Sequence, residues 1–262
     1  MRKYLIGVIA GLAGALALSG VASAAVTGVR TGFSIAPAKQ DKKVRGPASV
    51  FFESNDVHSG AFLGQPGCLI GNEGAGCFAF PPSVRTVLTF STDIKFDPGK
   101  LPDCNLASLV GQSTAGAKAA CPKSIVGGGT NVQAFSDGST RSGVITAFNG
   151  APSGGHPALY LHIDLPGVTT KPILNGVISG NTLDVQIPPV PGTVIQHFDT
   201  TLNPVVTKKK KNKSTGKVQK TYYLSAKCSK KQWSVTEDVT YQNGQHQIDS
   251  TTQPCKQKKK KK

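Results

Sequence analysis

The chain is 262 residues long and strongly basic, with 30 Lys/Arg against 14 Asp/Glu and a formal net charge of +16 at pH 7. The charge is uneven, because residues 25–204 hold 12 Lys/Arg and 11 Asp/Glu, whereas residues 205–262 hold 16 lysines and three acidic residues. The basic character therefore belongs to two lysine-rich blocks, 208–220 and 256–262. Neither block contains an aromatic residue, which excludes specific nucleic-acid recognition by base stacking.

The first 24 residues predict a secretory signal peptide. Arg2 and Lys3 precede an apolar run from Tyr4 to Leu18, and Ala22-Ser23-Ala24 forms a small-residue cleavage site. The apolar run is too short for a membrane span, and no second long apolar segment follows. We therefore expect cleavage after Ala24 and a mature chain without a transmembrane anchor, secreted and either extracellular or associated with the cell wall.

An even number of cysteines in an exported chain predicts disulfides. The six positions are Cys68, Cys77, Cys104, Cys121, Cys228 and Cys255. They allow many pairings, of which the simplest joins sequence neighbours. A metal site is the alternative, but no C-x-x-C spacing occurs and no histidine lies close to a cysteine pair, so we expect no metal and no cofactor.

In chain order, residues 25–46 are polar and basic without periodicity, which predicts a flexible basic arm before a single β domain over 47–255. Alternating apolar and polar segments then recur between Gly, Asn, Asp and Pro turns, and Asn243-Gly244 is a strong hairpin signal. The segments expected to form strands are 48–53, 84–96, 125–135, 142–148, 157–165, 173–178, 182–187, 197–206, 217–226, 232–242 and 245–252. Phe62–Phe80 is expected to be a disulfide-closed loop inserted between them.

Residues 104–130 interrupt this pattern. Ala115–Ala120 favours helical turns, so Cys104 and Cys121 are expected to enclose a short helix. The predicted fold is all-β, an antiparallel β-sandwich of immunoglobulin-like or jelly-roll-like type, with one short disulfide-bracketed helical insertion. Residues 256–262 are expected to form a disordered poly-Lys tail, because the lysines repel one another and have no apolar partners.

Several motifs resemble those of an uncharacterised group of secreted actinobacterial proteins. They are Pro102-Asp103-Cys104, Ala120–Thr130, Val144–Gly150 and a final hairpin with Cys228, Trp233, Tyr241, Gly244 and Pro254-Cys255. The resemblance covers residues 84–255 and implies an extracellular β-sandwich with disulfides 104–121 and 228–255. It implies no catalytic residue, and the Cys68/Cys77 loop departs from the pattern.

One strand offers an enzyme-like set of side chains. Tyr160, His162 and Asp164 alternate with leucines and share a face, with His156 and His197 as additional candidates. Such a set could serve an extracellular hydrolase or a metal-dependent enzyme. A solvated sheet face explains the same alternation, so we assign no catalytic residue.

The lysine blocks are the remaining functional feature. The predicted polyanion-binding residues are Lys208, Lys209, Lys210, Lys211, Lys213, Lys256, Lys258, Lys259, Lys260, Lys261 and Lys262. Exposed lysines attract anionic polymers and anionic lipid surfaces, although they can also serve solubility alone. The preferred interpretation is a non-catalytic surface or matrix protein that binds anionic cell-wall polymers or anionic lipid. The sequence gives no indication of its oligomeric state.

Overall fold

The computed structural model describes residues 28–57, 61–62, 77–78, 82–99, 101–135, 139–190, 193–211, 216, 218–242 and 244–258. The predicted signal peptide, Cys68, Lys213 and Lys259–Lys262 lie outside these ranges, as does any bond between Cys68 and Cys77. The elements of the first half are β1 Gly28–Ala36, β2 Lys39–Gln40, β3 Gly46–Pro47, β4 Ser49–Val57, β5 Ala61–Phe62, β6 Cys77–Phe78, β7 Ser83–Phe90, β8 Ile94–Phe96, the 3-10 helix η1 Leu106–Ser108, α1 Thr114–Ala120 and β9 Ile125–Phe135.

Every element described in the second half is a strand. They are β10 Thr140–Ser153, β11 His156–Asp164, β12 Ile173–Ser179, β13 Thr182–Gln186, β14 Thr193–Leu202, β15 Val206–Lys211, β16 Val218–Tyr222, β17 Leu224–Ala226, β18 Gln232–Tyr241, β19 His246–Pro254 and β20 Lys256–Gln257. The antiparallel all-β fold with one short helical insertion is thereby confirmed. The helix α1 lies between Cys104 and Cys121, which form a disulfide as expected.

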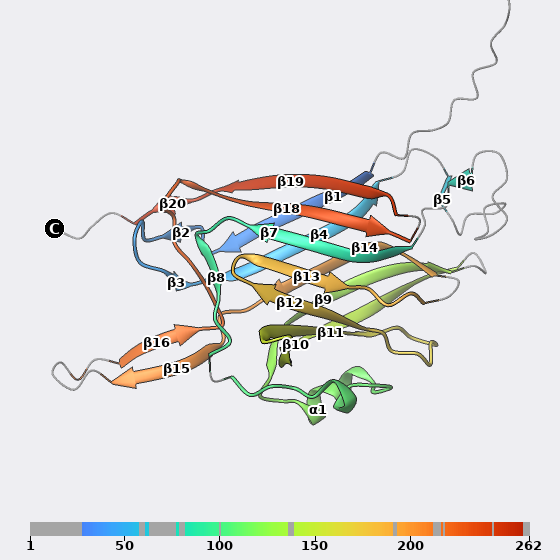
Figure 1. Cartoon of the computed structure of the whole chain (residues 1–262), viewed down its shortest axis with the longest axis horizontal. Coiled ribbons are helices and arrows are strands. Elements are labelled where there is room, and N and C mark those ends of the chain that lie inside the picture. Colours follow the sequence, from blue (N-terminus) through green and yellow to red (C-terminus); the bar gives the residue numbers. More distant parts are fainter. Residues whose placement is uncertain are drawn as a thin grey trace, which may run out of the picture.

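Eleven strands form one continuous antiparallel sheet in the order β1-β4-β14-β9-β10-β11-β12-β13-β7-β18-β19. Its two edge strands, β1 and β19, lie side by side (Figure 1). Side chains of β19 join these edges by hydrogen bonds to the backbone of β1. Asp249 Oδ2 accepts a hydrogen bond from Thr31 N at 2.7 Å, Gln253 Oε1 accepts one from Ile35 N, and Gln253 Nε2 donates one to Ile35 O. The core therefore lies between opposed parts of a single curved sheet.

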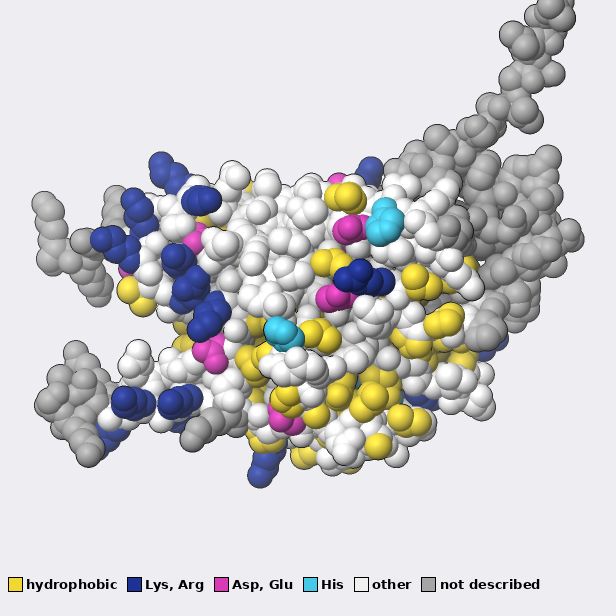
Figure 2. Space-filling model, viewed as in Figure 1, with side chains coloured by type: hydrophobic (Ala, Val, Ile, Leu, Met, Phe, Trp, Pro, Cys, Tyr) yellow, Lys and Arg dark blue, Asp and Glu magenta, His cyan; other side chains and the backbone are white. Residues whose placement is uncertain are grey.

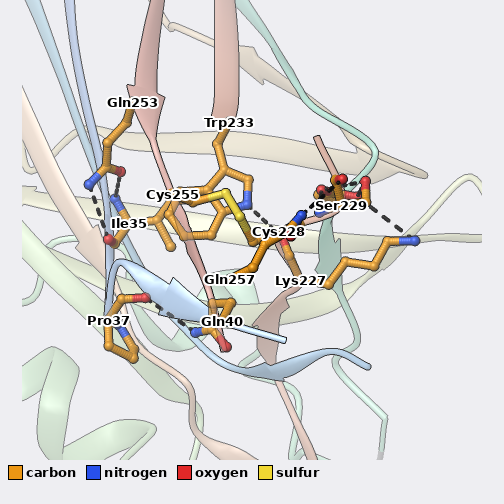
Figure 3. Close-up of a disulfide and its surroundings, with 11 residues drawn as sticks. Ile35, Pro37, Gln40, Lys227, Cys228, Ser229, Trp233, Gln253, Cys255 and Gln257 are labelled. Atoms are coloured by element: carbon orange, nitrogen blue, oxygen red, sulfur yellow. Dashed lines mark hydrogen bonds and ion pairs between the residues drawn. A yellow bond between two sulfur atoms is a disulfide. The ribbon is translucent and has the colours of Figure 1, made fainter. Parts of the chain in front are cut away.

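Period-2 alternation places the apolar side chains inside. On β11, Leu159, Leu161 and Ile163 are buried in the main core, as their spacing predicts. Trp233 is also fully buried, and its Nε1 donates to Lys227 O at 2.6 Å beside the Cys228–Cys255 disulfide (Figure 3). That disulfide lies at the open ends of the β18–β19 hairpin and has the pairing that the resemblance implies.

The glycines at the start of β9 allow close packing of neighbouring strands. A Cβ on Gly127 would lie 2.0 Å from Thr201 O, and one on Gly129 would lie 2.0 Å from Asp199 O, both on β14. Because no side chain fits there, the glycines allow β9 and β14 to pack closely.

Three predicted boundaries are wrong. The expected flexible arm contains the long edge strand β1, paired along its length with β4, because Val29, Thr31 and Ile35 alternate into the interior. The lysines at 208–211 belong to strand β15, paired with β16, instead of a loop. The first residues of the expected disordered tail are ordered instead, since Lys256 and Gln257 form β20 and pair in parallel with β2. Lys259–Lys262 lie outside the described residues.

Candidate polyanion-binding surface

The enzyme-like set on β11 is covered, because Tyr160 and His162 are buried and Asp164 is half-buried. The disulfide-closed insertion, residues 104–121, covers this face of the sheet and packs Leu109 and Ala117 against Tyr160. His162 is 0 % exposed, and its Nε2 lies 2.9 Å from Gln112 O. Burial lowers the pKa of His162, partly offset by the hydrogen bond to that carbonyl.

Asp164 anchors the insertion to the sheet. Its Oδ2 accepts hydrogen bonds from Thr114 N at 2.7 Å and from Thr114 Oγ1 at 3.0 Å, at the first residue of α1. Its Oδ1 lies 2.6 Å from Lys171 Nζ. The hydrogen bond from Lys171, followed by that from Thr114 N, lowers the pKa of Asp164 from 3.8 to about 2. The carboxylate is thus occupied by structural partners.

The other histidines of the predicted set are elsewhere. His156 is exposed at the start of β11, whereas His197 lies on β14, with Nδ1 2.7 Å from Asn55 Oδ1 and Nε2 3.1 Å from Asp199 Oδ2. The structure does not bring these histidines to His162. The outward face of β11 is neither solvated nor an open pocket, because residues 104–121 cover it. Within the described ranges, no group of three or more His, Cys, Asp or Glu side chains is placed to hold a metal ion.

Basic residues from four separated segments meet at one end of the molecule. Strand β20 pairs with β2, while β17 pairs with both β3 and β8. Lys256 N donates to Ala38 O at 2.8 Å, and Gln257 Nε2 donates to Cys228 O at 2.9 Å. We call residues 39–47, 91–97, 227–231 and 256–258 together the basic end; its internal scaffold is drawn in Figure 3.

The basic end carries a large excess of positive charge. Its four segments contain ten Lys/Arg and three Asp/Glu residues, counted directly on the sequence. The cations are Lys39, Lys42, Lys43, Arg45, Lys95, Lys227, Lys230, Lys231, Lys256 and Lys258, and all except the half-buried Lys227 are exposed. In Figure 2 these dark-blue side chains gather at the end of the molecule where the C-terminus leaves the fold.

The few carboxylates of the basic end are already engaged. Asp93 is buried and accepts hydrogen bonds from Ser229 N and Oγ, with Lys227 Nζ at 3.8 Å. Asp97 lies 3.4 Å from Lys95. Asp41 accepts the backbone N–H groups of two residues in the β2–β3 turn. The exposed lysines therefore keep a positive field directed at solvent.

A second basic element projects beside this end. The β15–β16 hairpin, which we call the lysine ribbon, exposes all four side chains from Lys208 to Lys211. Lys209 lies directly opposite Lys220, so like charges face each other across the pair. The ribbon is a separate two-stranded sheet, seen at the lower left in Figure 1.

The structure divides the predicted lysine set into two groups. Lys208–Lys211 lie on the ribbon, and Lys256 and Lys258 on the basic end, whereas Lys213 and Lys259–Lys262 lie outside the described residues. Sequence reasoning missed the cations of the β2–β3 turn and the cluster at 227–231. The Cys228–Cys255 pairing was the available signal, because it places residue 227 beside residue 256.

Comparisons with known proteins found no matching family model, no similar curated protein and no similar solved structure. In the part of the chain that the structure describes, no helix has the length and apolar character to cross a bilayer. Function must therefore be inferred from the geometry of this chain.

Proposed function

We propose that this protein is an exported, non-catalytic surface or matrix protein whose basic end binds anionic polymers of the cell envelope. The observation that carries the proposal is the convergence of ten cations from four segments on one end of the molecule, against three engaged carboxylates. The disulfides 104–121 and 228–255 support export to an oxidising compartment, together with the N-terminal signal sequence.

The chemistry of the surface favours a repeating anion over a single small ligand. Exposed ammonium groups bind phosphates and carboxylates mainly through charge, and the attraction grows with the number of anionic units in reach. The lysine ribbon extends this surface with four consecutive exposed lysines. Anionic lipid headgroups are the second source of the same chemistry, since polybasic surfaces are attracted to acidic membranes.

A binding measurement on the mature protein tests the proposal. The probes are long-chain inorganic polyphosphate and, as a separate arm, vesicles with and without anionic lipid, each titrated over a range of salt concentrations. The logarithm of the affinity should fall linearly with the logarithm of salt concentration, by roughly 0.7 to 0.9 per phosphate neutralised if polyphosphate follows the nucleic-acid relation.

The double variant Lys42→Gln/Lys43→Gln removes two exposed charges from the basic end and should flatten that salt slope. The matched control is Lys118→Gln/Lys123→Gln, which removes two exposed charges near the disulfide-closed insertion. The proposal is overturned if both variants bind with the same affinity and slope as the unaltered protein. In that case the lysines serve solubility alone.

A further inference from the structure

An open groove adjoins the basic end. It lies between β8, which belongs to the basic end, and the neighbouring ends of β11, β12 and β13 (Figure 1). Its volume is about 380 Å³. Sites that hold single small ligands have volumes of roughly 300 to 1,000 Å³. The groove therefore has room for one small ligand or one repeat unit of a polymer.

One wall of the groove is basic. Arg45, from the β2–β3 turn, and Lys95, from β8, are both exposed and line it. Arg45 Nη2 donates to Thr92 O at 2.7 Å, which holds the guanidinium against the turn before β8. A guanidinium has further N–H donors in a planar fork that matches a carboxylate. Lys95 Nζ lies 3.4 Å from Asp97, but none of the described residues that line the groove is Asp or Glu. This wall can therefore bind an acid group.

The rest of the groove is suited to a neutral ligand surface. His156 and Asn181 provide hydrogen-bonding groups on the wall opposite Arg45, and Pro157 lies beside His156. Apolar side chains complete the lining; they are Ile94, Phe96 and Ile178. A ligand that contacts all of these groups carries one acid group, hydroxyl groups and a C–H surface.

Among anionic polymers, polysaccharides with acidic sugars combine these properties. A neutral sugar makes no use of the basic wall, and a polyphosphate makes no use of the apolar surface. We propose that the groove binds one acidic sugar unit of an anionic polysaccharide, with the sugar carboxylate at Arg45 and the ring against Pro157. This inference rests on the proposed function, whose polymer it identifies as a polysaccharide. The units that follow along the chain lie against the other cations of the basic end.

The test is a titration of the mature protein with trigalacturonate at about 150 mM sodium chloride, followed by amide chemical shifts. Galactotriose and tripolyphosphate form two separate arms, since the first lacks the acid group and the second lacks the sugar ring. We expect saturable shifts on both walls of the groove with trigalacturonate, including Asn181. Galactotriose should cause none, and tripolyphosphate should leave Asn181 unshifted.

A variant that fills the groove leaves the charge of the protein unchanged. Thr92→Trp places a bulky neutral side chain at a lining position, while the backbone oxygen that receives Arg45 remains. It should weaken trigalacturonate binding by at least about tenfold. The matched control is Val110→Trp, at a position that is 64 % exposed and outside the groove, and it should bind like the unaltered protein.

A second variant tests the acid group and does not depend on the folding of the filled variant. Arg45→Gln should weaken trigalacturonate binding by about tenfold or more, because hydrogen bonds to a charged group are lost. Arg30→Gln makes the same change at an exposed position on β1, away from the groove, and should bind like the unaltered protein.

The inference is overturned if trigalacturonate causes no saturable shifts, or if galactotriose or tripolyphosphate occupies the groove equally well. It is also overturned if Thr92→Trp or Arg45→Gln binds trigalacturonate like its matched control. The proposed function has its own readout, the salt-dependent binding of long-chain polyphosphate. A protein that binds polyphosphate in this way but not trigalacturonate keeps the proposed function and loses only the sugar site.

Discussion

At the scale of single residues, Asp164 and His162 show how tertiary packing changes the role of a strand face. Both occupy polar positions of an alternating strand, yet the disulfide-closed insertion covers them. Asp164 accepts a hydrogen bond from Thr114 N, at the first residue of α1. His162 is buried and contacts Gln112 O through its Nε2. The two side chains therefore contribute to stability, and each contribution depends on pH.

Asp164→Asn should destabilise the protein by about 2 kcal/mol at pH 7, because charge-assisted bonds to Lys171 and Thr114 are weakened. The pKa of Asp164 is lowered to about 2, so its contribution is fully present above 3.8 and is lost as pH falls toward 2. Denaturant unfolding between pH 2 and 7 measures both effects. The control is Asp184→Asn, whose 2.6 Å pair with Arg85 is more exposed and should cost about 0.5 kcal/mol.

His162→Gln should reduce the loss of stability on mild acidification. Burial lowers the pKa of His162 in the folded state, so the unfolded chain takes up the proton more readily and stability falls as pH drops below about 6.5. Unfolding free energies between pH 7.5 and 5 should show a smaller slope in the variant. The exposed His156→Gln retains His162 and should keep the slope of the unaltered protein. Equal slopes in all three proteins would contradict this account.

At the scale of elements, β20 shows that a lysine-rich segment can be ordered by backbone pairing. Lys256 N and Lys258 N donate to Ala38 O and Gln40 O at 2.8 and 2.9 Å. The preceding Cys255 is held by its disulfide, which delivers the chain beside β2. The side chains of both lysines remain in solvent, so Lys256 and Lys258 stabilise the fold with their backbone and add charge to the basic surface with their side chains.

Two truncations separate these contributions. A chain that ends at Cys255 loses the two backbone hydrogen bonds and the bond from Gln257 Nε2 to Cys228 O, and should be less stable by about 2 to 3 kcal/mol. A chain that ends at Lys258 retains all three and should stay within about 0.5 kcal/mol of the full chain. Thermal or denaturant unfolding measures the difference. Equal stability of the two truncated chains would show that β20 contributes nothing to the fold.

At the scale of the whole molecule, charge and topology act together. The strand order brings positive charge to one end of the sheet, where the cations repel one another as well as attract anions. Salt weakens interactions between exposed charges, since the screening length is about 10 Å at 0.1 M ionic strength. Salt should therefore stabilise the folded state relative to the unfolded chain, because the cations lie close together only in the folded state.

Raising sodium chloride from about 20 mM to about 200 mM should raise the melting temperature by a few degrees. The same salt change should have a smaller effect on Lys42→Gln/Lys43→Gln, in which part of the repulsion is removed. Differential scanning calorimetry of the mature protein measures both. A melting temperature that falls with salt would indicate that favourable ion pairs outweigh repulsion at the basic end.

Features that depend on local pattern could be predicted from the amino-acid sequence. Alternation identified the β11 and β18 strands, helix-favouring residues between Cys104 and Cys121 identified α1, and both described disulfides join sequence neighbours. Period and turn chemistry are properties of a few consecutive residues, so they can be read without knowing the strand order. The edge strand β1 was missed because its apolar positions are mixed with Thr31 and glycine.

Which residues share a surface or an interior became clear only from the folded structure. Lys39 meets Lys256, the insertion covers His162, and Arg45 and His156 line one groove. Each of these contacts joins segments far apart in the chain, and the order of strands in a sheet is set by the packing of the whole core. The basic end and the groove therefore follow from the fold, while the strands that build them follow from the sequence.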